Sequence, residues 1–160
     1  MWLSSTAQQA LHAVLCIAQA DGDAPVRVDD IARVMGCPRN YLSKTLHLLT
    51  RAGVLRSERG PKGGFRLATS AERLTLARII APFEPAGRRR CLVGRATCGD
   101  AHPCPVHHRW KEIAGSVDEF FKKTTIASLL EGSQQAPAEA REVVESLRNT
   151  NRRISHGSAA

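Results

Sequence analysis

Apolar side chains recur every three or four positions near the start of the chain, which is the spacing of an amphipathic helix. The apolar positions are Ala7, Ala10, Leu11, Val14, Leu15 and Ala18. Thr6 and Gln9 are placed three residues apart just before and within this stripe, as in a capping box. The pattern therefore predicts a first helix that is capped by this pair.

Two more helices are predicted, separated by a short break at "GCPRN". The segment "VDDIARVMG", residues 28–36, has two acids in its first turn, where the helix dipole favours them, and a glycine at its end. A third helix is expected from about Pro38 to Ala52, with Leu42, Leu46 and Leu49 on one face. Its opposite face carries Asn40, Ser43, Lys44, His47 and Arg51. A short helix, a glycine-containing turn and a helix with a polar, basic face form the helix-turn-helix pattern.

The next segment, "VLRSERGPKGGFRLA" at residues 54–68, predicts a β-hairpin with a Gly/Pro/Lys tip. Leu55, Phe65 and Leu67 are expected to point inward. The residues expected to point outward are basic: Arg56, Arg59, Lys62 and Arg66. A basic hairpin directly after two such helices is typical of a winged helix-turn-helix domain, so we favour this over an ordinary surface hairpin. The predicted fold class is mainly α, with a small β-hairpin wing.

The remaining pattern predicts a connecting helix in "AERLTLARIIAPFEP", ended by Pro82 and Pro85, and a basic linker "GRRR" at 87–90. A longer helix is expected from about His107 to Lys123. Its apolar face is formed by Trp110, Ile113, Val117 and Phe120. We expect a partner subunit to cover this face, with packing onto the chain's own domain as the alternative.

These elements divide the chain into four parts. Residues 1–86 are expected to form the DNA-binding winged domain, 87–106 a cysteine-rich loop and 107–132 a dimerisation helix. The small and polar residues 133–160 predict a mostly disordered tail, with a weak helix near 141–147.

Charge sharpens the DNA-binding interpretation. The net charge is +8, and the segment from Gly36 to Ala68 holds seven Lys or Arg residues against one acid, Glu58. A focused basic patch attracts phosphate backbones, although a solvated arginine-rich surface gives the same charge. The chain has no secretory signal pattern and no long apolar run, so we expect a cytoplasmic protein. It has no nucleophile–base set and no phosphate-binding loop, so we expect no enzyme.

The stretch "CLVGRATCGDAHPCPVHHRW", residues 91–110, holds three of the five cysteines and three of the six histidines. The ligand candidates are spaced as Cys91-x6-Cys98-x5-Cys104, with His107 three residues later. Clustered thiols in a reducing compartment more often bind metal than form disulfides. Thiolate and imidazole ligands suit either structural zinc or an iron–sulfur cluster, and both stay open on this chemistry.

The remaining cysteines and histidines have simpler interpretations. Cys16 and Cys37 are expected to be small buried hydrophobic residues. His102 and His108 are expected to be exposed neighbours of the site.

The sequence resembles the Rrf-two family of bacterial winged-helix regulators over roughly residues 1–132. The matching features are the helix "QQALHAVLCIA", the block from "VDDIARVMG" to "FRLA" with the wing phrase "RGPKGGF", and the cysteine loop running into "CPVHHRW". The resemblance implies a homodimer, most often a repressor, that binds a palindromic promoter site. It also implies one iron–sulfur cluster per subunit, [2Fe–2S] or [4Fe–4S], held by the three loop cysteines.

The resemblance offers two patterns for the fourth cluster ligand. One is a histidine three residues after the last cysteine, which His107 matches. The other is an acidic residue near the N-terminus of the partner subunit, but that position is Gln8 here and no acid precedes Asp21. His107 is therefore our first choice, and His12, reaching across the dimer, is the second.

The predicted function is transcriptional regulation of iron, cluster-assembly or redox and nitric-oxide stress genes. The major-groove contacts are expected from Arg39, Asn40, Tyr41, Ser43, Lys44 and His47. The wing residues Arg59 and Lys62 are expected to reach the minor groove or its phosphates. The alternatives are a DNA-binding protein with structural Cys3His zinc and an electron-transfer cluster protein, which would leave the basic wing unexplained.

Overall fold

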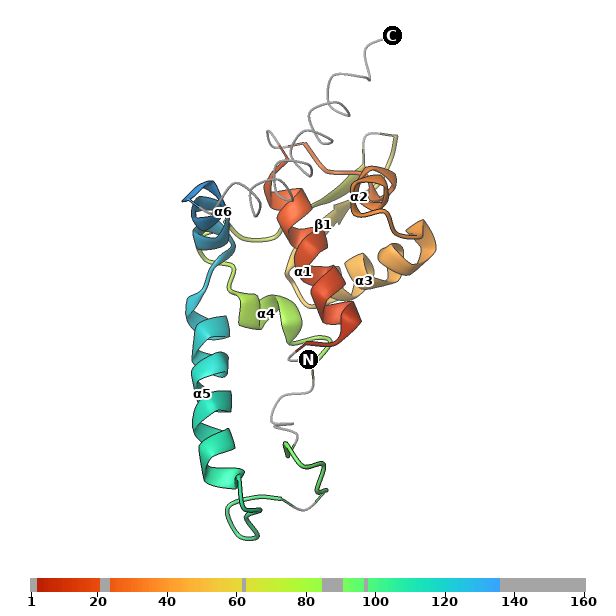
Figure 1. The fold of residues 1–160 in the computed structure, drawn as a ribbon. Helices are drawn as coiled ribbons and strands as arrows, with labels where there is room; N and C mark the ends of the chain where they lie inside the picture. The colour runs from red at the N-terminus through yellow and green to blue at the C-terminus, as the bar shows by residue number, and fades with distance from the viewer. Residues whose placement is uncertain (1–2, 21–23, 62, 85–90, 97, 136–160) are drawn as a thin grey trace.

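The structure is a computed structural model that describes residues 3–20, 24–61, 63–84, 91–96 and 98–135. Its helices are α1 (Ser5–Ala18), α2 (Val28–Met35), α3 (Arg39–Arg51), α4 (Leu76–Ile80), α5 (His107–Lys123) and α6 (Ile126–Gln135), and its strands are β1 (Leu55–Glu58) and β2 (Gly64–Leu67). The fold is mainly helical with one antiparallel hairpin, as predicted. Figure 1 shows α5 running away from the α1–α3 head, with the cysteine loop at its distant end.

Helix α1 starts earlier than the sequence pattern indicated. Ser4 is its N-cap, with an extended backbone and a hydroxyl that accepts a hydrogen bond from the N–H of Ala7 at 3.2 Å. The expected Thr6–Gln9 capping box is therefore wrong. Because Ser4 already supplies the cap, Thr6 lies inside the first turn and its side chain contacts the Tyr41 hydroxyl at 2.8 Å.

Helices α2 and α3 follow the prediction closely. Gly36 ends α2 with φ of 60°, a left-handed conformation that glycine adopts without strain. Leu42, Leu46 and Leu49 on α3 are fully buried. The first face of α3 thus anchors the helix, and its opposite face is left to solvent.

The hairpin pairs β1 with β2 and places Leu55 opposite Leu67. Phe65 also exchanges two 2.8 Å backbone hydrogen bonds with Val26, in the segment before α2. This bridge requires glycine next to it, because a Cβ on Gly64 would lie 2.7 Å from the carbonyl carbon of Val26. The double glycine of the wing is therefore a close-approach feature as well as a turn signal.

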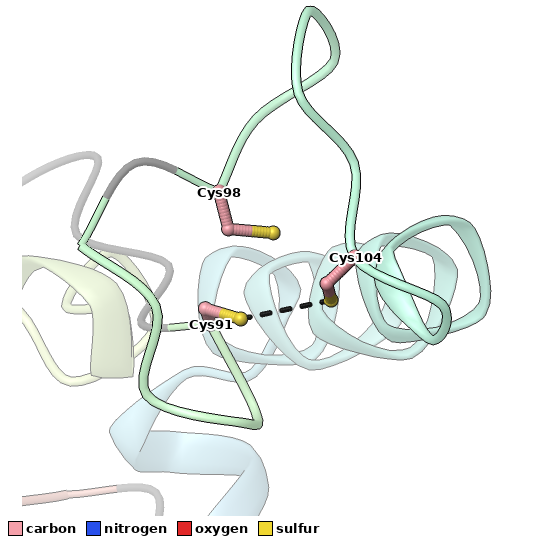
Figure 2. Close-up of side chains that lie close together, drawn as sticks. All are labelled: Cys91, Cys98 and Cys104. Carbon is pink, nitrogen blue, oxygen red and sulfur yellow. Dashed lines mark hydrogen bonds between the residues drawn. The ribbon is translucent and has the colours of Figure 1, made fainter.

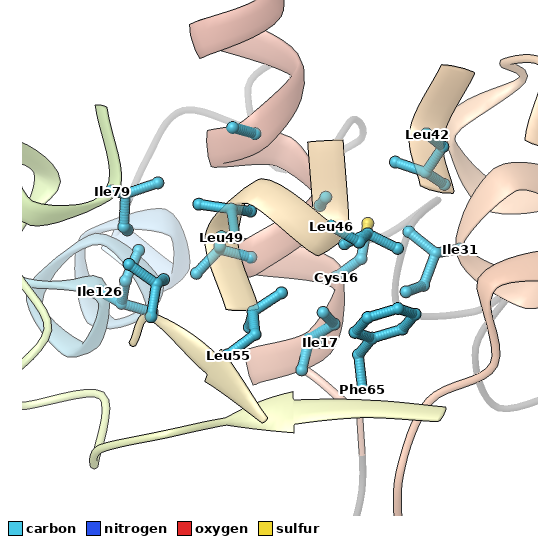
Figure 3. Close-up of a cluster of buried hydrophobic side chains, with 14 of the residues drawn as sticks. Cys16, Ile17, Ile31, Leu42, Leu46, Leu49, Leu55, Phe65, Ile79 and Ile126 are labelled. Carbon is cyan, nitrogen blue, oxygen red and sulfur yellow. The ribbon is translucent and has the colours of Figure 1, made fainter. Parts of the chain in front are cut away.

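The core is centred on α1, against which α2, α3, α4, β2 and α6 pack. Figure 3 shows Cys16, Ile17, Ile31, Leu42, Leu46, Leu49, Leu55, Phe65, Ile79 and Ile126 in one cluster. Burial raises the pKa of the Cys16 thiol to about 11, so this side chain stays neutral and acts as a small hydrophobic residue, as expected. Cys37 is half-buried against the same cluster.

The C-terminal region differs most from the expected elements. Helix α4 starts only after its N-cap Thr75, and the predicted dimerisation segment 107–132 is two helices with a break between them. The break arises because Thr124 is extended and its carbonyl accepts from the N–H of Leu76 at 3.0 Å. Ile126 is then fully buried, and α6 continues to Gln135, three residues into the segment 133–160 expected as tail.

Several expectations fall outside the described residues. They concern Pro85, the basic linker at 87–90, Lys62, the tail from residue 136 and its weak helix at 141–147. Among the described residues, no helix is long and apolar enough to cross a membrane.

Candidate metal centre and nucleic-acid interface

Three loop cysteines converge on one point. The Sγ atoms of Cys91, Cys98 and Cys104 all lie within 4.8 Å of one another, and those of Cys91 and Cys104 are 3.7 Å apart. Figure 2 shows the three side chains directed toward a common centre. Cys104 is buried, the other two are half-buried, and none of them forms a disulfide. The predicted thiol ligands are therefore brought together by the fold.

Tight local turns produce this convergence. The N–H of Gly94 donates to the carbonyl of Cys91 at 2.9 Å, and Gly94 has a φ of 74°, where a side chain would be strained. A second turn joins Gly99 and His102, whose N–H donates to the Gly99 carbonyl at 3.1 Å. A third turn, from Cys104 to His107, leads directly into α5.

The thiols differ in acidity. Desolvation acts to raise the pKa of Cys91, but backbone hydrogen bonds from Arg95 and Val93 and the two neighbouring thiols outweigh it and lower the pKa to about 7. At Cys98 a backbone hydrogen bond from Cys104 lowers the pKa, but desolvation and the other two thiols prevail and raise it. One thiol of the group is thus substantially ionised near neutral pH, the state in which cysteine binds metal.

His107, the expected fourth ligand, stands at the edge of this group. It is the first residue of α5, its side chain is 13% exposed, and its Nδ1 lies 3.2 Å from the Sγ of Cys98. His102 and His108 are exposed, as expected, and His12 is exposed on α1. Within this subunit, His107 is the histidine that contacts a thiol of the group.

Two residues that the sequence interpretation missed complete the arrangement. The Nε2 of His107 lies 2.9 Å from Asp100 Oδ1, and Lys111 Nζ donates to both Asp100 oxygens at 2.9 and 2.7 Å. Hydrogen bonds from Lys111 and then from His107 lower the pKa of Asp100 to about 2. The helical spacing of Lys111 from His107 was a usable signal, whereas the loop conformation that directs Asp100 was not.

The proposed DNA-reading face of α3 is open to solvent. Arg39, Asn40, Tyr41, Lys44 and His47 are exposed, and Ser43 is half-buried. Arg59 is exposed on the hairpin, whereas Lys62 lies outside the described residues. The expected basic surface is therefore accessible on α3 and the wing together.

Some of these side chains already have partners within the chain. Arg39 Nε lies 2.6 Å from the carboxylate of Asp29 on α2, and the ring of His47 meets Phe65 edge-on. Within the part of the chain that the structure describes, Asn40 and Lys44 make no polar side-chain contact. These two residues are therefore the freest to meet a base or a phosphate.

Helix α1 holds the recognition helix in place. The hydroxyl of Thr45, which is buried on α3, donates to Gln9 Oε1 at 3.4 Å, and the Thr6–Tyr41 contact lies nearby. Gln9 therefore serves this packing rather than the expected capping box.

The predicted dimer face of α5 lies at the surface of the single chain. Ile113 and Phe120 are 46% and 55% exposed, and Trp110 and Val117 are half-buried. Ala114 is the buried residue of this helix. The chain's own domain therefore leaves much of this apolar face uncovered.

Comparison with known proteins gives these features a common context. A profile for the Rrf2 family, the family written above as Rrf-two and described as an iron-dependent transcriptional regulator, matches residues 3–132. A protein of Aquifex aeolicus (strain VF5) named as an HTH-type transcriptional regulator is 38% identical over 133 residues, which cover 81% of this chain and 92% of that protein. The HTH-type transcriptional regulator IscR of Vibrio atlanticus (strain LGP32) is 28% identical over 134 residues, covering 84% of this chain and 78% of IscR.

Solved structures share the fold. CymR, the global cysteine regulator of B. subtilis, matches with a TM-score of 0.67 at 24% identity, covering 79% of this chain and 94% of CymR. T. potens IscR matches with a TM-score of 0.65 at 24% identity, covering 82% of this chain and 87% of that one. The winged-helix architecture predicted from the sequence is thereby confirmed.

Proposed function

Since the chain belongs to the Rrf2 family of transcriptional regulators, we propose that it is an iron–sulfur cluster-sensing, DNA-binding regulator that acts as a homodimer on a palindromic promoter site. Its relatives are regulators and not enzymes. Repression of iron, cluster-assembly or redox and nitric-oxide stress genes is the proposed mode, with the cytoplasm as the proposed location.

The convergence of the three thiols within 4.8 Å carries the cluster part of this proposal. Cys91, Cys98 and Cys104 would hold the cluster, and His107 would supply the fourth ligand. The residues suit such a group because thiolates are the protein's usual ligands for iron–sulfur clusters and because the Cys91 pKa of about 7 makes a thiolate available. When bound, an iron–sulfur cluster supplies a centre that responds to oxidants and to iron supply.

DNA recognition is assigned to α3 and the hairpin. Asn40 and Lys44 are the leading candidates because they are exposed and make no polar side-chain contact within the described residues. Arg39, Tyr41, Ser43 and His47 complete the proposed major-groove set, and Arg59 and Lys62 the wing contacts. Dimerisation through α5 would pair two such heads, as two-fold operator sites require.

A chain of contacts supports communication between the two regions. His107 starts α5, and α5 packs on α4. On α4, Arg78 Nη2 donates to the carbonyl of Gly53 at 3.1 Å, two residues beyond the end of α3. We propose that cluster gain or loss changes the position of α3 through this route.

One observation favours a second candidate, structural zinc. Two thiolates on one tetrahedral zinc ion at about 2.3 Å lie about 3.8 Å apart. The Cys91–Cys104 separation of 3.7 Å is close to this value. The separation also suits two thiolates that share one iron, so it leaves the metal open.

Anaerobic purification followed by iron, zinc and acid-labile sulfide analysis tests the cluster proposal. We expect iron and sulfide with visible absorbance, whereas equimolar zinc without sulfide would refute it. Binding of the cluster-loaded and cluster-free protein to its own promoter region tests regulation. We expect the two affinities to differ by about 1–3 kcal/mol, the usual size of allosteric coupling. Equal affinities across a broad set of duplexes would remove the cluster's regulatory role.

A further inference from the structure

We propose that Asp100, held in place by Lys111, is a positioning residue that keeps the proton of the His107 ring on Nε2 and so directs Nδ1 to the cluster. This inference rests on the proposed function, because it concerns the same cysteine loop. It adds the ligating atom of the fourth ligand and the two residues that select it.

The geometry assigns opposite roles to the two ring nitrogens. Nδ1 of His107 faces the Cys98 sulfur at 3.2 Å, and Nε2 faces Asp100 Oδ1 at 2.9 Å. A carboxylate only accepts hydrogen bonds, so Nε2 must carry the proton in this contact. A neutral imidazole has one N–H and one lone pair, and its lone pair is therefore on Nδ1, beside the converging thiols.

Lys111 fixes the carboxylate that makes this selection. It lies four residues after His107, one turn along the same face of α5. Its Nζ contacts both oxygens of Asp100, at 2.9 and 2.7 Å, so the carboxylate is held from the helix as well as from the loop. The three side chains thus form a relay from Lys111 through Asp100 to His107.

Exposure argues against a role in stability. The side chains of Asp100 and Lys111 are 68% and 49% exposed, and ion pairs at such sites contribute little to folding. The His107 ring is only 13% exposed, so its orientation is constrained where theirs is not. A carboxylate behind a metal-binding histidine is a common device for fixing the tautomer and ring orientation, and its loss typically costs 10–100-fold in metal affinity or activity.

The decisive measurement is pulsed electron paramagnetic resonance of the full-length, cluster-loaded protein in its paramagnetic state. Histidine labelled with nitrogen-15 at Nδ1 or at Nε2 is incorporated in parallel samples. We expect strong hyperfine coupling from the Nδ1 label, its disappearance in His107→Ala, and weak coupling from the Nε2 label. Strong coupling from Nε2, or none from either nitrogen, would overturn the inference while leaving a cluster-binding regulator intact.

Cluster lifetime in the presence of an iron chelator gives a second, independent readout. We expect Asp100→Ala to shorten the lifetime about 10-fold. Asp100→Asn, which keeps an acceptor oxygen, should recover part of the loss, and Lys111→Met should give a smaller loss than Asp100→Ala.

Lys123→Met is the matched control, because it removes a lysine–carboxylate contact with Glu119 at 3.3 Å at the other end of α5. Its lifetime should equal that of wild type. An equal effect of Lys123→Met, or no effect of Asp100→Ala and Asp100→Asn, would overturn the inference. Wild-type protein that holds no cluster would overturn both the inference and the proposed function.

Discussion

Replacing Gly64 with alanine tests how the wing is joined to the rest of the domain. The new Cβ would lie 2.7 Å from the carbonyl carbon of Val26 and even closer to its oxygen, so one of the two segments must move. The atoms in the way belong to backbone, which cannot turn aside as a flexible side chain can. The expected movement separates Val26 from Phe65 and breaks their two 2.8 Å hydrogen bonds.

The magnitude follows from those bonds. Each backbone hydrogen bond contributes about 0.5–1.5 kcal/mol net, so losing both costs about 1–3 kcal/mol. Replacing glycine by alanine also reduces the entropy of the unfolded chain, which offsets about 0.4–1 kcal/mol. We expect Gly64→Ala to lower the free energy of unfolding by about 1–2 kcal/mol.

Urea unfolding at one fixed protein concentration measures this change, since the stability of a dimer depends on concentration. Gly132→Ala is the matched control, because Gly132 is exposed within α6 and an added Cβ there meets nothing within 4 Å. We expect this control to gain up to about 1 kcal/mol from helix propensity. If Gly64→Ala is as stable as wild type, the close approach of the wing to Val26 is not a real constraint.

Three other predictions address the candidate sites. Alanine at Cys91, Cys98 or Cys104 is expected to abolish a stable cluster, measured by iron and sulfide content, and to leave a folded dimer. Cys16→Ala and Cys37→Ala should keep the chromophore, and a chromophore that survives in the loop variants would refute the ligand set. His107→Ala is expected to give a labile cluster with an altered visible spectrum; a wild-type spectrum there, beside a labile cluster in His12→Ala, would assign the fourth ligand to α1 of the partner. Lys44→Ala is expected to weaken DNA binding uniformly and to reduce the slope of log affinity against log salt by about 0.9, whereas Asn40→Ala should change base preference. Unchanged binding of both variants to every duplex would contradict the assignment of α3.

The elements that the sequence predicted well are those set by neighbouring residues. The glycine after α2 ends that helix as expected, and α5 spans the predicted His107–Lys123. The leucine face of α3 is buried because its period matches the helix, whatever it packs against. The convergence of the loop cysteines was predicted for a similar reason, since their spacing and the intervening glycines restrict the loop.

The features that the sequence did not predict depend on contacts between distant segments. The break between α5 and α6 arises because Thr125 pairs with Thr75, fifty residues earlier in the chain. The Arg39–Asp29 ion pair joins two helices whose relative angle no local pattern sets. Asp100 became part of the site only through the loop conformation that brings it to His107 and Lys111.

The position of His107 explains how a small loop could influence DNA binding. The residue is both the proposed ligand and the first residue of α5, so a ligand bond there would act directly on the start of this helix. The far end of the same region is tied to the head, because Leu76 accepts no freedom once its N–H is bonded to Thr124 and Ile126 is fully buried. A shift at one end of α5 must therefore be taken up by bending, by movement at the α4 contact, or by movement of the partner's α5. The Arg78–Gly53 hydrogen bond makes the α4 contact the one that reaches α3, so Arg78→Met should reduce the affinity difference between cluster-loaded and cluster-free protein without changing cluster content. An unchanged difference would mean that the signal passes through the dimer instead.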